Sequence, residues 1–153
     1  MRLRRATPAD ISSMRQIEQM TDTAAHWSDA QYGALFSADA PVRVALIAAD
    51  ESSDALIMGL LIARCLGDEW EIENIIVEAQ HRQQGVGSSL VRELLQQART
   101  AGAASVILEV RESNRPALVL YESIGFKAEG RRENYYQAPA EGALLYRIKI
   151  TDL

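Results

Sequence analysis

Several stretches of the chain concentrate apolar residues in the manner of β-strands. Residues 42–49 (VRVALIAA) and 55–66 (ALIMGLLIARCL) are rich in apolar and β-branched side chains, and the ESSD between them predicts a turn. These two segments are therefore expected to form a hairpin. Residues 2–6 (RLRRA) predict a short strand, and residues 104–110 (ASVILEV) form a nearly continuous apolar run, typical of a strand covered on both faces.

One further stretch, residues 70–77 (WEIENIIV), alternates between polar and apolar positions. Successive side chains of a β-strand point to opposite faces of the sheet. The alternation predicts a strand with Glu71 and Glu73 on one face, and Ile72 and Asn74 on the other.

The helical spacing of apolar residues predicts four helices, over residues 7–20, 28–36, 86–102 and 114–125. Three of these segments begin with Thr, Ser or Asn, whose side chains accept hydrogen bonds from the free backbone N–H groups of a first helical turn. The last segment ends at Gly125, and glycine commonly follows the final turn of a helix.

A last pair of strands is expected around residues 126–130 and 143–150, on either side of a polar segment, 131–142, that predicts a loop. The resulting order is β-α-α-β-β-β-α-β-α-β-β. It indicates an α+β (mixed α/β) fold, and the length of 153 residues favours a single domain over 1–153.

Composition narrows the classes of function. Hydrophobic residues make up 48% of the chain and charged residues 24%, and the net charge is −5, which disfavours a nucleic-acid backbone binder. No apolar run approaches the length of a transmembrane helix, and the N-terminus does not resemble a secretory signal. Cys65 is the only cysteine and His26 and His81 the only histidines, too few ligands for a Cys/His zinc site. We therefore expect a cytoplasmic protein without metal, and with no nucleic-acid or membrane partner.

A glycine-containing loop, Arg82–Gly87 (RQQGVG), stands between a predicted strand and a predicted helix. It lacks the Gly-Lys-Ser/Thr of a Walker loop and is too short for the Rossmann motif. Gly85 and Gly87 allow backbone N–H groups to approach an anion at the start of the helix. Two glycines alone are equally consistent with a simple turn.

Together with NRPALVLYESIGF downstream (114–126), this loop resembles the GCN5-related N-acetyltransferases (GNAT), whose signature is Gln or Arg, two residues, Gly, one residue, then Gly or Ala. The resemblance implies a central, mostly antiparallel, twisted sheet of six to seven strands flanked by about four helices, with a parallel pair splayed to hold acetyl-CoA. It also implies that the loop amides bind the pyrophosphate of acetyl-CoA. The cofactor-binding residues implied are Ile75, Ile76, Val77, Arg82, Gln83, Gln84, Gly85, Val86, Gly87, Ser88 and Asn114.

Five segments, 17–19 (IEQ), 27–29 (WSD), 108–114 (LEVRESN), 120–126 (LYESIGF) and 131–136 (RRENYY), are similar to bacterial RimI-type ribosomal protein alanine N-acetyltransferases. The resemblance implies direct acetyl transfer to the N-terminal α-amine of a protein, with the alanine of a small-subunit ribosomal protein as target. It leaves the oligomeric state open between a monomer and a weak dimer. The chain departs from the family pattern in two places, with histidine for proline before WSD and glycine for an acid after Glu141.

The same resemblance implies that Glu109 is the general base and that Tyr121 protonates the departing thiolate. Glu71 lies where more distant relatives keep their base, so the choice between Glu109 and Glu71 stays open. A neutral α-amine makes a carboxylate an adequate base, because an amine of pKa about 7.7–8.0 is already roughly one-tenth neutral at pH 7. Substrate contacts are expected from Trp27, Glu71, Tyr135 and Tyr136.

Two alternatives remain beside this reading. One is an enzyme of the same fold that acetylates lysine side chains or a small-molecule amine. The other is a non-catalytic regulator that binds acetyl-CoA without turnover.

Overall fold

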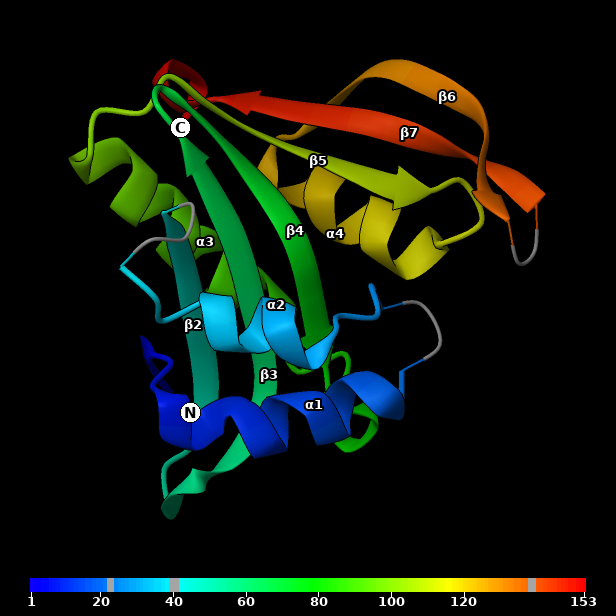
Figure 1. Cartoon of the computed structure of the whole chain (residues 1–153). Coiled ribbons are helices and arrows are strands. Elements are labelled where there is room, and N and C mark those ends of the chain that lie inside the picture. Colours follow the sequence, from blue (N-terminus) through cyan, green and yellow to red (C-terminus); the bar gives the residue numbers. More distant parts are fainter. Residues whose placement is uncertain (22–23, 39–41, 138–139) are drawn as a thin grey trace.

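The fold is described from a computed structural model, which covers residues 1–21, 24–38, 42–137 and 140–153. Its centre is a seven-stranded sheet of order β1-β2-β3-β4-β5-β7-β6 (Figure 1). The strands are β1 (Arg2–Arg5), β2 (Arg43–Asp50), β3 (Ser53–Leu66), β4 (Glu69–Val77), β5 (Ser105–Arg111), β6 (Lys127–Gln137) and β7 (Ala140–Lys149). Neighbouring strands are antiparallel except β4 and β5, which are parallel, as expected from the resemblance.

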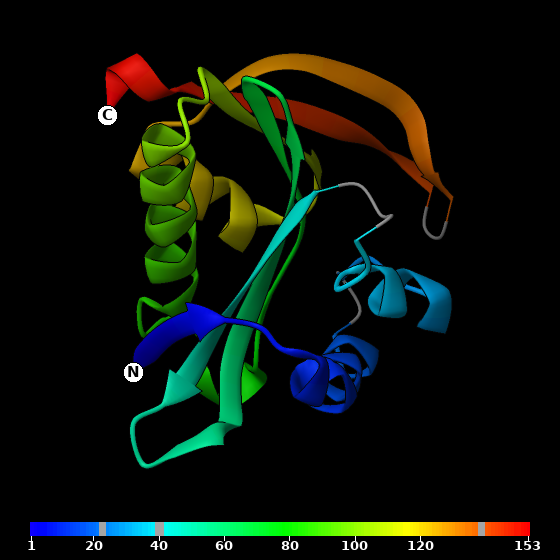
Figure 2. The same ribbon diagram turned by 60° about the vertical axis from the view of Figure 1, so that its left-hand side comes forward.

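Helices cover both faces of the sheet. They are α1 (Ile11–Gln19), α2 (Asp29–Ala34), α3 (Val86–Thr100) and α4 (Arg115–Ile124), and three short 3-10 turns lie at Pro8–Asp10, Ala79–His81 and Ile150–Asp152. Figure 2 shows α1 and α2 on one side of the sheet and α3 on the other, where α4 also lies. The four predicted helices and the predicted element order are confirmed. No described helix is both long and apolar enough to span a bilayer.

The two faces of the sheet carry two separate apolar clusters. Leu90 and Leu94 of α3 pack with Leu108 of β5 in the cluster beneath α3 and α4. Met14 and Tyr32 belong to the second cluster, which joins α1 and α2 to β2, β3 and β4. Burying both faces explains why β2 and β3 are almost continuously apolar in sequence.

The parallel strands β4 and β5 pair over only four residues each, Glu69–Ile72 with Ser105–Leu108. Beyond this point no further pairing joins them, and Figure 1 shows the two strands diverging. Residues of both strands beyond this point line a cavity that is described below. This splayed pair places the candidate site.

A β-bulge in β4 lies where the splay begins. Ile62 of β3 is opposite Asn74, whereas the next residue, Ala63, is opposite Ile72, so Glu73 is an extra residue in the ladder. Ile62 lies in the α1/α2 cluster and Ala63 in the α3/α4 cluster. The predicted placement of Ile72 and Asn74 on one face is therefore wrong, because the bulge moves Asn74 to the α1/α2 face.

The last two strands are longer than predicted. The polar segment expected to be a loop, 131–142, instead supplies residues 131–137 of β6 and 140–142 of β7, and residues 138–139 lie outside the described residues. β6 is an edge strand with an irregular register, and most of its described residues near the hairpin tip are exposed, so no alternation of burial marks it in the sequence. The prediction of a loop there is wrong for this reason.

Candidate active site

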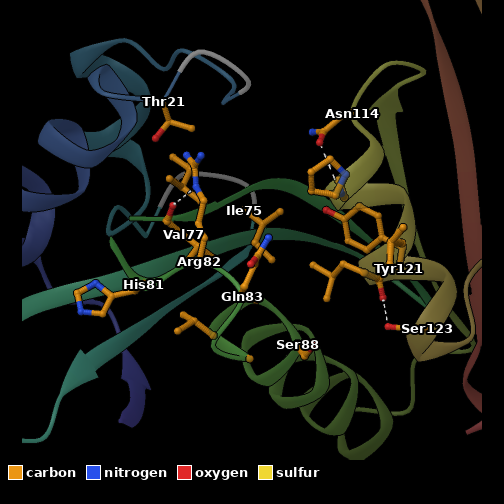
Figure 3. A pocket seen from close by; sticks show the side chains of 18 of the residues that line it. Thr21, Ile75, Val77, His81, Arg82, Gln83, Ser88, Asn114, Tyr121 and Ser123 are labelled. Carbon is orange, nitrogen blue, oxygen red and sulfur yellow. Dashed lines mark hydrogen bonds between the residues drawn. The ribbon is translucent and has the colours of Figure 1, made fainter. Parts of the chain in front are cut away.

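A cavity of about 740 Å³ opens between β4, the loop before α3, and α4. Figure 3 shows Ile75 and Val77 on one side of this cavity, with Asn114, which precedes α4, and Tyr121 of α4 across from them. We call this space the larger cavity. Its lining includes most of the residues that the sequence predicted for the cofactor: Ile75, Ile76, Val77, Arg82, Gln83, Gly85, Val86, Gly87, Ser88 and Asn114.

Gln84 is the predicted cofactor residue that does not line the larger cavity; its side-chain amide donates to the carbonyl of Gln80 at 3.0 Å. Arg82 lines the cavity and its Nε donates to the carbonyl of Val77 at 3.3 Å. The loop is thereby tied back to the end of β4.

The backbone of the loop suits an anion. Gln83 has φ +61° and Gly85 has φ +81°, both left-handed conformations, and α3 begins immediately afterwards at Val86. Left-handed residues next to a helix start turn successive N–H groups toward a common concavity, and the helix dipole adds positive potential there. Gly87 has a different role, because a Cβ there would lie 3.1 Å from Cδ2 of Leu120 on α4. Its lack of a side chain keeps the loop and α4 close.

Gly59 was not singled out from the sequence, although it shapes the same region. A Cβ at this position would lie 2.8 Å from the carbonyl oxygen of Ile76 and 3.0 Å from Cγ1 of Val86. Glycine therefore allows this part of β3 to lie close to its neighbour β4 and to the first turn of α3. A lone glycine inside an apolar strand is a signal of such close approach.

A second cavity, of about 320 Å³, opens on the α1/α2 side of the splayed strands. We call it the smaller cavity. Four residues line both cavities, which therefore meet at Ile75, Asn114, Ala117 and Tyr121. Of the other predicted residues, Glu109 and Tyr136 line the smaller cavity, as do Glu73 and His26.

Tyr121 stands at the junction of the cavities. Its ring is almost fully buried and packs against Phe126, with 5.6 Å between ring centroids. Burial raises the pKa of Tyr121 above its ordinary value, which is already near 10, so the hydroxyl is protonated at neutral pH. Asn114 accepts a hydrogen bond from the N–H of Ala117 at 3.3 Å and so caps the helix that carries Tyr121.

Glu109 enters the smaller cavity from β5. Its Oε1 lies 3.3 Å from the guanidinium of Arg132 on β6. Its Oε2 is buried and has no hydrogen-bond partner among the described residues. A buried carboxylate oxygen without a partner is costly, and a substrate ammonium group or a water molecule would satisfy it.

The other carboxylates of this region are paired. Glu71 accepts a hydrogen bond from Arg64 at 3.1 Å and does not line either cavity. Glu73 accepts one from Arg43 at 2.8 Å at the edge of the smaller cavity. The structure thus separates the two candidate bases, Glu109 at the cavity and Glu71 away from it.

Of the aromatic residues predicted to contact the substrate, one lines the smaller cavity and two do not. Tyr136 lines the smaller cavity, and the guanidinium of Arg111 lies 4.1 Å from its ring centroid. Tyr135 packs edge-on against Tyr136 and is 46% exposed, and the nearby charge of Glu109 raises its pKa. Trp27 lies outside both linings and packs against Tyr32, with ring centroids 5.7 Å apart.

The described residues contain no cluster of three or more His, Cys, Asp and Glu side chains suited to a metal ion. The site therefore consists of a loop suited to an anion, a buried tyrosine and a carboxylate around the gap between β4 and β5.

A comparison with protein families decides the classification. The model of the "Acetyltransferase (GNAT) family" matches residues 11–126, which include the loop, α3, β5 and α4. The chain belongs to the GNAT family.

Several relatives of this GNAT protein are N-acetyltransferases. The chain is 30% identical to a Bacillus subtilis protein named putative [ribosomal protein bS18]-alanine N-acetyltransferase, over 94% of this chain and 91% of that protein. It is 40% identical to the Escherichia coli [ribosomal protein bS18]-alanine N-acetyltransferase, over 59% of this chain and 62% of that enzyme. An uncharacterised Mycobacterium leprae protein is 34% identical over 94% of this chain, which spans only 38% of that protein.

Solved structures agree with this assignment of the fold. The crystal structure of the E. coli S18-alanine enzyme has a TM-score of 0.80 at 27% identity, covering 97% of this chain and 93% of that one. Arabidopsis thaliana NAA60 in complex with acetyl-CoA has a TM-score of 0.86 at 17% identity, covering 97% and 98% of the two chains. The prediction of a GNAT fold is thereby confirmed.

Proposed function

We propose that this protein transfers an acetyl group from acetyl-CoA to the N-terminal α-amine of a protein, by direct transfer in a ternary complex. The observation that carries the proposal is the meeting of two cavities at Tyr121, with Glu109 in the lining of the smaller one. Such an arrangement accepts two substrates at once, each with a proton-transfer group beside it.

The residues of the larger cavity fit the cofactor. The left-handed Gln83 and Gly85 and the start of α3 would hold the pyrophosphate, and the apolar side chains of Ile75 and Val77 would lie along the pantetheine arm. Bound in this cavity, acetyl-CoA would supply a reactive thioester. NAA60, a protein of the same fold, has been crystallised with acetyl-CoA.

The ammonium nitrogen must lose two protons to become an amide nitrogen, one before and one after it attacks the thioester carbon, and the departing sulfur must gain one. Glu109 would take a proton from the incoming ammonium group, directly or through water, so that a neutral amine is presented at the junction. Tyr121, which is protonated at neutral pH, would donate its proton to the departing sulfur as the C–S bond breaks, and the second proton lost by the nitrogen would restore the hydroxyl. Glu71 is the less suitable base, because it lines neither cavity.

The substrate we propose is an N-terminal alanine, specifically that of a small-subunit ribosomal protein. The names of the B. subtilis and E. coli relatives support this choice. It agrees with an acidic enzyme, net charge −5, acting on a basic partner in the cytoplasm. Acetylation of a lysine or a small amine is the alternative, and the presence of both Glu109 and Tyr121 disfavours a non-catalytic regulator.

Mass spectrometry on a designed peptide tests the proposal. The peptide begins with alanine, has a basic tail and carries one internal lysine; a second copy has a blocked α-amine. We expect acetylation of the free N-terminus and none of the blocked copy. Acetylation of the lysine in both copies would favour the alternative enzyme, and binding of acetyl-CoA without any product would contradict the proposed activity.

A further inference from the structure

One wall of the smaller cavity is a short segment between α1 and α2. Ala24, Ala25 and His26 line the cavity, and Trp27 follows them. Two buried polar side chains, Glu18 and Asn74, reach this segment from different elements, and neither lies in the catalytic pair described above.

Asn74 approaches the segment from β4. Its side chain is 5% exposed; its Nδ2 donates to the carbonyl of Ala25 at 3.2 Å, and its Oδ1 accepts from the N–H of the same residue at 3.4 Å. The amide thereby satisfies both backbone groups of Ala25, as a neighbouring strand would. It can do so because the bulge at Glu73 turns Asn74 to the α1/α2 face.

Glu18 approaches the segment from α1. It is 3% exposed, and its Oε1 accepts the backbone N–H of Trp27 at 2.7 Å. Hydrogen bonds to a buried charged group are stronger than neutral ones, so this contact strongly disfavours movement of the segment. Burial and the adjacent Glu18 carboxylate also raise the pKa of Tyr32, which packs against Trp27.

These contacts hold a wall that presents two small side chains, Ala24 and Ala25, and the imidazole of His26 to the cavity. Glu109 of β5 and Tyr136 line the same cavity. A held wall gives the cavity a set width, whereas a loose wall would yield to a larger occupant.

We propose that Asn74 and Glu18 are positioning residues that hold the Ala24–Trp27 wall and thereby restrict the first residue of the acceptor peptide to a small side chain. This proposal rests on the proposed function of the site. Glu18 lines neither cavity, and the two polar atoms of the Asn74 side chain are both bonded to Ala25, so we expect both residues to act on peptide binding and selectivity and to leave the chemical step unchanged.

The test compares two peptides that differ only in their first residue, alanine or leucine. Asn74→Leu replaces the amide with an apolar side chain of similar size and removes both hydrogen bonds to Ala25. Asn74→Ser is a smaller change that serves if the leucine variant does not fold, and Glu18→Gln keeps an acceptor for Trp27 but removes the charge. The control is Asp10→Asn, because Asp10 is a buried carboxylate paired with Arg4, away from both cavities.

For the Asn74 variants we expect KM for the alanine peptide to rise about tenfold, with kcat and KM for acetyl-CoA changed less than twofold. The preference for alanine over leucine, measured by kcat/KM, should fall at least fivefold. Glu18→Gln should show a smaller shift in the same direction, and Asp10→Asn none. Amide hydrogen exchange at Ala25 should become faster in the Asn74 variants.

Two results would overturn the inference, and they differ from failure of the proposed function. If wild-type protein acetylates the alanine peptide and the Asn74 variants keep the wild-type preference, the wall does not depend on Asn74. A loss confined to kcat, with KM unchanged, would likewise exclude a positioning role. If the wild-type protein acetylates no free N-terminus, the proposed function itself is wrong and the selectivity claim falls with it.

Discussion

Tyr121 and Glu109 approach the gap between β4 and β5 from different elements, and of these two residues Tyr121 alone lines both cavities. Tyr121 comes from α4, whose first turn is capped by Asn114, and Glu109 comes from β5. Glu109 faces only the smaller cavity. The proposed proton acceptor therefore lies at the smaller cavity, where we propose that the amine binds, and the proposed proton donor lies where the two cavities meet.

Replacing Tyr121 with phenylalanine removes the proposed donor and keeps the ring that packs against Phe126. We expect kcat to fall by about 100- to 10,000-fold, the typical contribution of general acid catalysis. The dissociation constant of coenzyme A, measured by calorimetry, should change less than threefold. A variant with wild-type kcat would show that the hydroxyl takes no part in the reaction.

Glu109→Gln and Glu71→Gln form a matched pair that separates the two candidate bases. Both residues lie on strands and each has an arginine partner, but only Glu109 lines the smaller cavity. We expect Glu109→Gln to lower kcat by about a hundredfold and Glu71→Gln to lower it less than threefold. The measurement is the initial rate at saturating peptide and acetyl-CoA, and the reverse ranking would assign the base to Glu71.

Gly85→Ala tests the loop, and Gly102→Ala is its control. Both glycines are left-handed, with φ +81° and +83°, and neither has an atom within 4 Å of an added Cβ. Each substitution should therefore destabilise the protein by a similar amount, about 1–2 kcal/mol. Only Gly85→Ala should also weaken acetyl-CoA binding, by about tenfold in equilibrium titration, because only Gly85 belongs to the proposed anion site. Equal affinities for the two variants would contradict that site.

The ion pair of Asp10 with Arg4 should make the free energy of unfolding depend on pH. Its hydrogen bonds with Arg4, 2.8 Å for each carboxylate oxygen, hold the pKa of Asp10 below its usual value. A lowered folded-state pKa stabilises the protein above the unfolded-state pKa, near 3.9, and this contribution disappears as the pH falls through the folded-state value.

At pH 6, Asp10→Asn should lower the free energy of unfolding by about 1.5–3 kcal/mol, the range for hydrogen bonds to charged groups. The difference from wild type should shrink as the pH falls toward 3, and urea denaturation at both pH values measures it. Arg4→Gln should cause a similar loss at pH 6, and the double variant should lose little more than either single one. Additive losses would mean that the two residues stabilise the fold independently.

The periodicity of the sequence was sufficient for the element order. Helices such as α3 bury one apolar stripe, and strands such as β2 bury both faces, so their patterns are distinct in sequence. The loop before α3 was likewise recognisable, because Gly85 and Gly87 stand directly before an amphipathic run. These features are local, and local features can be predicted from local sequence.

The features that were missed depend on distant partners. The bulge at Glu73 is set by pairing with β3, and alternation along β4 alone could not reveal it. Gly59 matters because of Ile76 and Val86, which are far from it in sequence. The exposed edge strand β6 is organised by its pairing with β7, and its own residues lack a two-residue period of burial.

The bulge at Glu73 also changes the face of the sheet to which the even-numbered side chains of β4 point. Ile72 belongs to the apolar cluster under α3 and α4, and Ile76 to the cluster under α1 and α2. Deleting a single residue here would exchange the faces of every β4 side chain after it, so Asn74 would leave Ala25, and Ile75 and Val77 would turn to the opposite face of the sheet. The protein would keep most of its strands, yet the side chains of β4 that line the two cavities would no longer face them.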